Sequence, residues 1–410
     1  AESMPTFDEV RKASADNWQR FWMFGGAIDF SLCTDPRAPE LERRVVLSQY
    51  LLAIQCAGSR PPQETGLTCN SWYGKSHLEM HWWHSVHFAL WNRLDLFERS
   101  LPWYQSVLPL TENTAKSQGY DGARWPKMVG PDGRESPSSV GVFLIWQQPH
   151  PIYYAELCYR ARPNRETLDR YRQIVFETAD FMASYAVWDE ANRRYVLGPA
   201  MIPAQESYGS DRARNLNPTF ELAYWRWALD TAQSWRQRLG LERNPKWDDV
   251  IDHLSRPTIR DGVYTGIETP PYTIRRDHPT MLAALGFVPA GPLIDRDVMK
   301  RTYDSILADW DWPSTWGWDY PMLAMTAARL GEPGAAVDAL FLESPKNRYL
   351  ANGHNYQAAR LPLYLPGNGG LLTAAAMMTA GWDGCPEGPA PGFPKDGKWN
   401  VRFEGLCRMP

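Results

Sequence analysis

Amphipathic helical periodicity from end to end is the feature that most constrains this chain. Apolar residues recur at three- and four-residue spacing in many segments of the 410-residue sequence, and many of these segments end at Gly or are followed by Pro. Strand-like alternation is short, as in residues 193–198 and 261–266. The sequence therefore predicts an all-α fold with helices in residues 7–22, 39–58, 77–94, 150–161, 165–186, 217–240, 246–254, 296–310, 319–331, 333–342 and 369–381.

Helices in such numbers can stack as hairpins into a solenoid or close into a double ring. A solenoid repeats its sequence at a fixed period, and no such period is visible here. No low-complexity stretch divides the chain. We therefore predict one (α/α)6 barrel, six helical hairpins around a funnel, over residues 25–410. The loops at one end of the funnel are expected to form the site.

Charge and hydropathy exclude two classes of partner. The formal net charge of -4 argues against a nucleic-acid binder, which usually has a concentrated basic surface. No stretch approaches the roughly 20 uninterrupted apolar residues of a membrane helix, so we expect a soluble protein. The first residues lack the basic and apolar regions of a signal peptide. The compartment is not identified, with a periplasmic or secreted location slightly favoured over a cytoplasmic one.

The six cysteines have no CxxC spacing and are few for this length, so neither a zinc site nor a disulfide framework is indicated. The informative excess is aromatic, with 20 Trp and 19 Tyr beside 8 His. Indole faces stack well on the C–H faces of sugar rings, although most Trp residues in any protein fill the core. The total favours a carbohydrate site.

Four of the eight histidines lie in residues 71–91, at positions 77, 81, 84 and 87. On a helix, His77, His81 and His84 share a narrow arc, which is one way to hold a metal ion. Histidines flanked by Trp are more often packed and hydrogen-bonded, and Glu79 projects to another side. We therefore predict no metal site here.

Three further segments combine polar and aromatic groups in loops. Residues 119–138 form a long loop with Arg124, Trp125 and Glu135, and such loops often line sites, the alternative being a solvated surface loop. Residues 309–322 interleave three aspartates with four tryptophans. A carboxylate among indoles is poorly solvated, which raises its pKa unless it finds donors, although acidic residues at helix starts are more often caps. Residues 352–370 offer His354, Asn355 and Gln357 as neutral polar groups.

Two carboxylates on opposed loops of a Trp-lined funnel are the catalytic groups that glycoside hydrolysis needs. One protonates the leaving oxygen and the other activates water. Nucleophilic and nucleotide-binding motifs have no support, because the chain has no GxSxG, no P-loop and no GxGxxG that opens a helix after a strand.

The order of these segments resembles the six-hairpin glycosidases, which include the phosphorylases of glycoside hydrolase family 65, the 1,2-α-L-fucosidases of family 95 and the trehalases. WYGKSHLEM (72–80) is similar to a sugar-site segment of both the fucosidases and the phosphorylases. GARWPKMVGPDGRES (122–136) resembles the GA-x-(F/Y)-P-W loop of the phosphorylases. PAQESYG (203–209) looks like their GPDEY segment and the fucosidase SPEN, and WDWPSTWGW (310–318) looks like the trehalase QWD-x-P-x-GW.

The resemblance implies that Glu206 is the general acid. Phosphorylases bind phosphate with two serines and a histidine; here the corresponding places look like Trp318, Asp319 and Asn355. Because an acidic side chain repels phosphate but can activate water, we expect hydrolysis rather than phosphorolysis. The fucosidase base is replaced by Pro366, so the base is expected at Asp319 first, Glu79 second and Asp311 third.

The sequence thus predicts an inverting hydrolase of an α-linked fucoside, galactoside or glucoside, with Glu206, Asp319 and Glu79 as catalytic residues. A phosphorylase of the same fold and a non-catalytic carbohydrate-binding protein remain as alternatives. No cofactor is required. The resemblance implies that residues 1–24 are a helical, linker-like segment, which joins the barrel to an N-terminal β-sandwich domain outside this chain. The residues expected to contact sugar are Trp72, His77, Arg124, Trp125, Glu135, Gln148, Asn217, Asp311, Trp316, His354 and Asn355.

Overall fold

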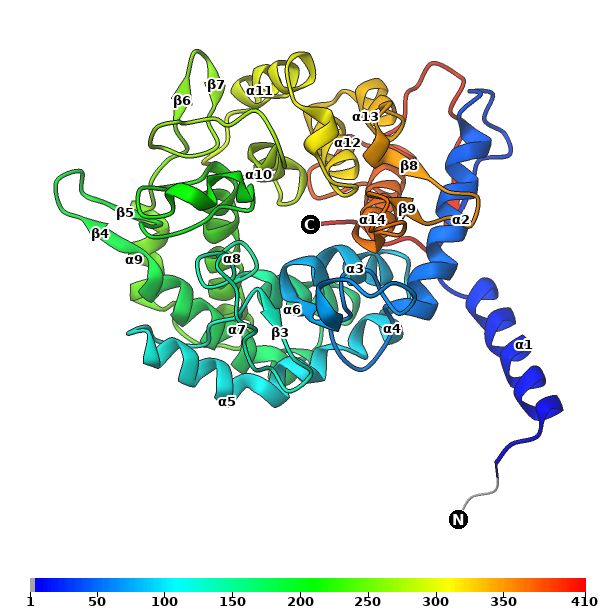
Figure 1. Ribbon diagram of the computed structural model, residues 1–410, viewed down its shortest axis with the longest axis horizontal. Helices are drawn as coiled ribbons and strands as arrows, with labels where there is room; N and C mark the ends of the chain where they lie inside the picture. Colours follow the sequence, from blue (N-terminus) through cyan, green and yellow to red (C-terminus); the bar gives the residue numbers. More distant parts are fainter. Residues whose placement is uncertain (1–3) are drawn as a thin grey trace.

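Fourteen α-helices dominate the computed structural model, which describes residues 4–410, and they form a double ring (Figure 1). Their bounds are α1 Phe7–Met23, α2 Ala38–Gln55, α3 Leu78–Leu90, α4 Leu94–Glu98, α5 Leu101–Ser117, α6 His150–Ala161, α7 Arg165–Tyr185, α8 Thr219–Arg238, α9 Pro245–His253, α10 Ala283–Gly286, α11 Arg296–Ala308, α12 Asp319–Leu330, α13 Pro333–Leu340 and α14 Leu365–Ala380.

Six of these helices form a closed inner ring. Helices α3, α6, α8, α10, α12 and α14 each pack against the next one, and α14 returns to pack against α3. Every residue of α3 and α10 is buried, whereas α7, in the outer ring, buries a single face. The outer helices α2, α5, α7, α9, α11 and α13 precede the inner ones in turn. The predicted (α/α)6 barrel of six hairpins is therefore confirmed.

Local capping explains where several helices begin and end. Asn164, Asn244 and Asp295 are N-caps whose side-chain oxygens accept backbone N–H groups of α7, α9 and α11. Gly331 ends α12 with φ of 82°, a left-handed conformation that glycine adopts without steric cost. These local signals are the reason why the predicted bounds of α7, α9, α11 and α12 agree with the structure to within about two residues.

One outer helix, α5, was missing from the sequence prediction. It contains Pro109 in its interior, and proline removes a backbone donor and normally argues against a helix. Its buried face, with Trp103, Tyr104 and Leu108, packs into the core and keeps the segment helical. Packing therefore overrides the local preference of the chain.

The strands are short and occur as five two-stranded antiparallel pairs in the described residues. The segments predicted to be strand-like, residues 193–198 and 261–266, contain β5 and β7. The pairs are β1 Ala27–Asp29 with β10 Arg402–Glu404, β2 Ser76–His77 with β3 Met128–Val129, β4 Val187–Asp189 with β5 Arg194–Val196, β6 Ile259–Arg260 with β7 Val263–Tyr264, and β8 Arg348–Tyr349 with β9 Asn355–Tyr356.

The N-terminal helix α1 projects from the barrel (Figure 1) and buries none of its residues. It occupies most of the segment predicted to be linker-like, residues 1–24, of which residues 1–3 lie outside the described range; the division at residue 24 stays a prediction. No helix in residues 4–410 is both long and apolar enough to cross a membrane. All six cysteine thiols are free in the described chain.

Candidate active site

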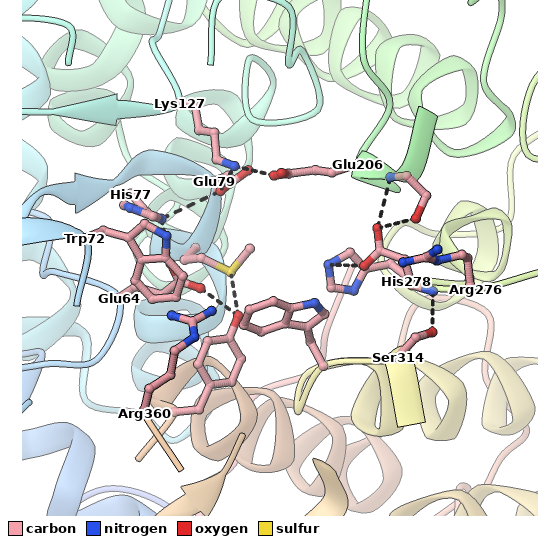
Figure 2. Close-up of a pocket in the computed structure, with 15 residues that line it drawn as sticks. Glu64, Trp72, His77, Glu79, Lys127, Glu206, Arg276, His278, Ser314 and Arg360 are labelled. Carbon is pink, nitrogen blue, oxygen red and sulfur yellow. Dashed lines mark hydrogen bonds and ion pairs between the residues drawn. The ribbon is translucent and has the colours of Figure 1, made fainter. Parts of the chain in front are cut away.

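A cavity of about 390 Å³ opens at the end of the barrel where the inner helices begin (Figure 2). The segments that line it lead into α3, α6, α8, α10, α12 and α14. The predicted placement of the site in loops at one end of the funnel therefore agrees with this cavity. Its lining residues are Glu64, Trp72, His77, Glu79, Met80, Lys127, Glu206, Ser207, Arg276, Asp277, His278, Ser314, Trp316, Arg360 and Tyr364.

Lys127 joins two carboxylates inside the cavity. Its Nζ lies 3.2 Å from Oε1 of Glu79 and also contacts Oε1 of Glu206. Glu79 is in the first turn of α3, and Glu206 begins the 3-10 helix η2 (Glu206–Asp211). The pairing of β2 with β3 places Lys127 against the start of α3, where its carbonyl accepts the backbone N–H of Leu78 at 2.8 Å. Segments distant in sequence thus bring both carboxylates to one ammonium group.

The two carboxylates differ in how deeply they are buried. The Glu79 side chain is 4% exposed and that of Glu206 is 35% exposed. Burial is the main cause that raises the pKa of Glu79 to about 7. The charge of Lys127 acts to lower this pKa, and the charge of Glu206 acts to raise it. Burial also acts to lower the pKa of Lys127, but the charges of Glu79 and Glu206 outweigh it and the pKa of Lys127 is raised. Lys127 therefore stays a cation at neutral pH.

A second buried carboxylate, Glu64, supports the wall beside Glu79. Its Oε2 lies 2.7 Å from Nδ1 of His77, and its Oε1 accepts the Tyr364 hydroxyl at 2.7 Å. Burial acts to raise the pKa of Glu64, but the charge of His77 and these contacts lower it overall. Glu64 is therefore held as a charged group that orients His77 and Tyr364.

His77, His81 and His84, which share a narrow helical arc in the sequence, have separate partners. His81 contacts the Tyr104 hydroxyl at 2.8 Å and Ser100 Oγ at 3.0 Å, and His84 contacts the Glu64 carbonyl at 3.0 Å. His77 alone of the three lines the cavity. Within residues 4–410 there is no group of three or more His, Cys, Asp or Glu side chains placed to hold a metal ion.

Asp319, predicted first as the base, does not line the cavity. It is fully buried, its Oδ1 lies 2.9 Å from Nδ1 of His278, and its Oδ2 accepts the Trp316 backbone N–H at 2.8 Å. His278 stands between Asp319 and the cavity and stacks on Trp318, with ring centroids 4.1 Å apart. In this structure Asp319 reaches the cavity only through His278, and its role as a base stays a prediction.

The charge of Asp319 acts on His278. Burial tends to lower the pKa of this histidine, but the charges of Asp319 and Asp277 outweigh burial and raise the pKa to about 9. His278 is therefore an imidazolium at neutral pH and lines the cavity as a hydrogen-bond donor. Asp277 is itself anchored, because its Oδ2 accepts the backbone N–H of Ser207 at 3.1 Å.

Aromatic rings form one side of the cavity. The rings of Trp72 and Trp316 have centroids 6.4 Å apart, and Trp316 and Tyr364 are 5.4 Å apart. The Arg360 guanidinium lies over the Trp72 ring, 5.8 Å from its centroid. Trp72 and Trp316, both predicted as sugar contacts, are thus brought together with carboxylates. Such a surface suits the C–H faces of a sugar ring.

Four predicted contacts lie behind the cavity wall and hold the loop that carries Lys127. Arg124 forms an ion pair with Glu135 at 3.0 Å, and Trp125 is fully buried with its indole N–H donated to Thr178. Gln148 Oε1 accepts the Trp125 backbone N–H at 2.8 Å. These residues do not line the cavity, and their contact with sugar stays a prediction.

The other predicted contacts also lie outside the cavity lining. Asn217 donates to Glu268 at 2.7 Å, and His354 contacts Gln55 at 3.1 Å. Asn355 donates to the Lys346 carbonyl at 3.0 Å, and the exposed Asp311 precedes the 3-10 helix η4 (Trp312–Ser314). The first three are buried and each contacts a protein group, while Nδ1 of His354 and Oδ1 of Asn355 have no hydrogen-bond partner within the described residues.

Sequence reasoning missed several lining residues, among them Glu64, Arg276, Asp277, His278 and Arg360. The segment RDHP (276–279) between an irregular region and the apolar α10 was a usable signal, because charged residues directly before a buried helix face its open end. Glu64 and Arg360 had no local signal, since only tertiary packing brings their loops to the funnel.

Solved structures show what this fold is similar to. A candidate kojibiose phosphorylase from the human microbiome aligns over 98% of this chain with a TM-score of 0.69 and 10% identity, and the chain spans 64% of that protein. A wild-type glycosidase aligns over 82% of this chain and 97% of its own length, with a TM-score of 0.59 and 15% identity. The E335A variant of a glycosidase, in complex with glucose, gives a TM-score of 0.61 at 14% identity, with 82% of this chain and 97% of that one covered.

No protein-family model and no curated protein matches the sequence. At such low identity the structural matches concern the fold and leave the reaction open. The predicted resemblance is therefore confirmed at the level of architecture: this chain has the six-hairpin (α/α)6-barrel fold found in these glycosidases and in the phosphorylase.

Proposed function

We propose that the protein cleaves O-glycosidic bonds of an α-linked sugar, with Glu206 as proton donor and Glu79 as the group that activates water. The observation that carries the proposal is the meeting of these two carboxylates in one cavity with an indole wall. Paired carboxylates beside a sugar-stacking surface are what glycoside hydrolysis requires.

Each carboxylate suits its assigned task. Glu206 is the more exposed and begins the short 3-10 helix η2, so it can reach the oxygen of a leaving group. Glu79 is fixed on α3 and buried, and a base with a pKa near 7 accepts a proton efficiently at neutral pH. In the reaction Glu206, protonated once it has left Lys127, gives its proton to the glycosidic oxygen as the C–O bond breaks. Glu79 takes a proton from the water whose oxygen bonds to the anomeric carbon.

The spacing of the pair bears on stereochemistry. Both carboxylates contact one ammonium nitrogen, so their nearest oxygens lie closer together than the roughly 6.5 to 9.5 Å typical of inverting enzymes. Inversion therefore requires Glu206 to leave Lys127 when sugar enters, which its exposed position on η2 allows. If Glu206 stays in place, the spacing suits retention instead.

Phosphorolysis is the second candidate, and one observation favours it. The expectation of hydrolysis relied on the negative charge of Asp319 at the place where relatives bind phosphate. Asp319 is buried behind His278, whose imidazolium lines the cavity. The charge that was expected to repel phosphate is thus neutralised by a cation that can attract it.

Proton NMR of the purified protein with α- and β-linked fucosyl, galactosyl, glucosyl and rhamnosyl oligosaccharides, with and without inorganic phosphate, tests the proposal. We expect phosphate-independent release of free sugar with inverted first-formed anomer, and a loss of about 100-fold or more in kcat for Glu206→Gln. Glu242→Gln, an exposed glutamate outside the cavity, is the matched control and should keep full activity. Sugar phosphate as product would establish phosphorolysis, and saturable sugar binding without turnover would establish a binding protein.

A further inference from the structure

Two arginines line the cavity without an acidic partner. Arg276 and Arg360 are both exposed, and neither takes part in any of the ion pairs found within residues 4–410. Figure 2 shows them on different sides of the cavity, Arg360 beside Trp72 and Arg276 beside His278. They come from separate loops, one before α10 and one before α14. These two guanidinium groups are therefore open to a ligand.

The other charged groups of the wall are already matched within the protein. Lys127 contacts Glu79 and Glu206, and His77 contacts Glu64 at 2.7 Å. A carboxylate that contacts a cation repels an incoming anion less than a bare one. The cavity cations that form no ion pair within residues 4–410 are therefore Arg276 and Arg360.

On the other side of the cavity, the aspartates Asp277 and Asp319 both contact His278. His278 contacts Asp319 at 2.9 Å, and the Oδ1 of Asp277 lies 3.6 Å from Nε2 of this histidine. The Oδ2 of Asp277 is occupied by the backbone N–H and hydroxyl of Ser207. Neither carboxylate forms an ion pair with the adjacent Arg276 guanidinium.

The backbone adds to this positive character. The inner helices α3, α12 and α14 begin at Leu78, Asp319 and Leu365 and point their N-terminal ends toward the cavity. A helix N-terminus has a partial positive charge that favours anions. Arg360 is also placed for sugar contact, because its guanidinium lies over the Trp72 ring. An oxyanion on a stacked sugar would thus lie within reach of Arg360.

We infer that the ligand of this cavity is an acidic carbohydrate, whose carboxylate or phosphate oxygens accept hydrogen bonds from Arg360 and Arg276. A guanidinium matches either oxyanion through two parallel N–H donors. The inference rests on the proposed function and adds the substrate class to it. The oxyanion has two chemical sources: an acidic group on the sugar, or free inorganic phosphate as co-substrate.

Dissociation constants of D-glucuronate, inorganic phosphate and D-glucose, measured by ligand-observed NMR at low ionic strength, test the inference without turnover. We expect glucuronate or phosphate to bind about 10-fold to 100-fold more tightly than glucose, the range that a charge-assisted hydrogen bond provides. Arg360→Gln and Arg276→Gln should each reduce this preference, and the double variant should remove it. Arg256→Gln, an exposed arginine outside the cavity, should leave it unchanged.

The two sources give different results. Preference for glucuronate assigns the charge to the sugar, and preference for phosphate assigns it to a co-substrate. Wild-type protein that prefers neither anion over glucose, or a preference that survives in the double variant, overturns the inference. Because binding is read without turnover, an acidic ligand that binds but is never cleaved contradicts only the proposed function. Cleavage of neutral glycosides that is insensitive to both substitutions contradicts only the acidic ligand.

Discussion

Nζ of Lys127 lies 3.2 Å from Oε1 of Glu79 in a cavity where both side chains are almost fully enclosed. The ammonium group is the main opposing influence on a carboxylate whose pKa burial raises to about 7. The protonation state of the proposed base therefore depends on its burial and on the charge of a residue from a separate loop.

Replacing Lys127 with methionine should shift the pH dependence of the reaction. Without the ammonium charge, burial and the charge of Glu206 raise the pKa of Glu79 further above about 7. Since a base acts when deprotonated, the rising limb of kcat/KM should move to higher pH, with a loss of about 10-fold to 100-fold at neutral pH. Lys127→Arg keeps the charge and should keep the limb in place. A methionine variant whose limb does not move would show that Glu79 is not the titrating group.

Substituting Glu221 with glutamine should stabilise the protein at alkaline pH only. Glu221 on α8 is fully buried outside the cavity, and burial raises its pKa from 4.5 to about 7. The raised pKa means that stability is fully present below about pH 4.5 and is lost as pH rises through about 7. Glutamine removes this loss, which is on the order of 3 kcal/mol.

The measurement is the free energy of unfolding from urea titrations of wild type and Glu221→Gln at pH 5 and pH 8. The difference between the two proteins should be several times larger at pH 8 than at pH 5. Oε1 of Glu221 accepts the Ala204 backbone N–H at 2.6 Å, a bond that glutamine can keep. Equal differences at both pH values would contradict the assigned pKa.

The Asp319→Asn substitution should lower the pKa of His278 from about 9, because the largest charge that raises it is removed. The raised pKa implies that the stability supplied by this pair is full below about pH 6.5 and is lost as pH rises through about 9. Imidazole NMR shifts across this range report the titration. The stability cost of the asparagine should therefore be larger at pH 6 than at pH 10, and a His278 resonance that titrates identically in both proteins would refute the pairing.

Removing an indole from the cavity should weaken sugar binding. Trp72→Ala and Trp316→Ala each delete a face of the aromatic wall, and we expect about a tenfold rise in KM with a smaller change in kcat. Trp188→Ala is the matched control, because Trp188 is 38% exposed and lies outside the cavity. If all three variants have the same KM as wild type, sugar does not stack on this wall.

The helical periodicity of the chain was sufficient to predict the barrel. Each amphipathic segment has one apolar face that must be buried, and local caps such as Asn164 and Asn244 set where helices begin. Helix α5 was missed because Pro109 counts locally against a helix, and the burial of Trp103 and Tyr104 decides in its favour. Helical faces are encoded within about a dozen residues, so the sequence shows them directly.

For the site, the sequence predicted some of the residues that line the cavity and the structure was needed for the others. Loop composition identified the segment of Trp316, and the family resemblance identified Glu79, Glu206 and the segment with Trp72 and His77; all five residues line the cavity. The sequence could not show that Asp319 differs from these lining residues. An aspartate among tryptophans has the same sequence pattern whether its side chain faces the cavity or contacts a histidine of the cavity wall from behind.

By itself, then, the sequence determined most of the helices, their order and the residue types available in the loops, but not α4, α5 or α10. Only the tertiary structure decided which charges meet: Lys127 with two carboxylates, His278 with Asp319, and Arg276 and Arg360 with no acidic partner in the described chain. The physical reason is range. Helix formation follows from neighbours a few residues apart, whereas a pKa depends on burial and on charges a few ångströms away in space, from loops tens to hundreds of residues apart in the chain.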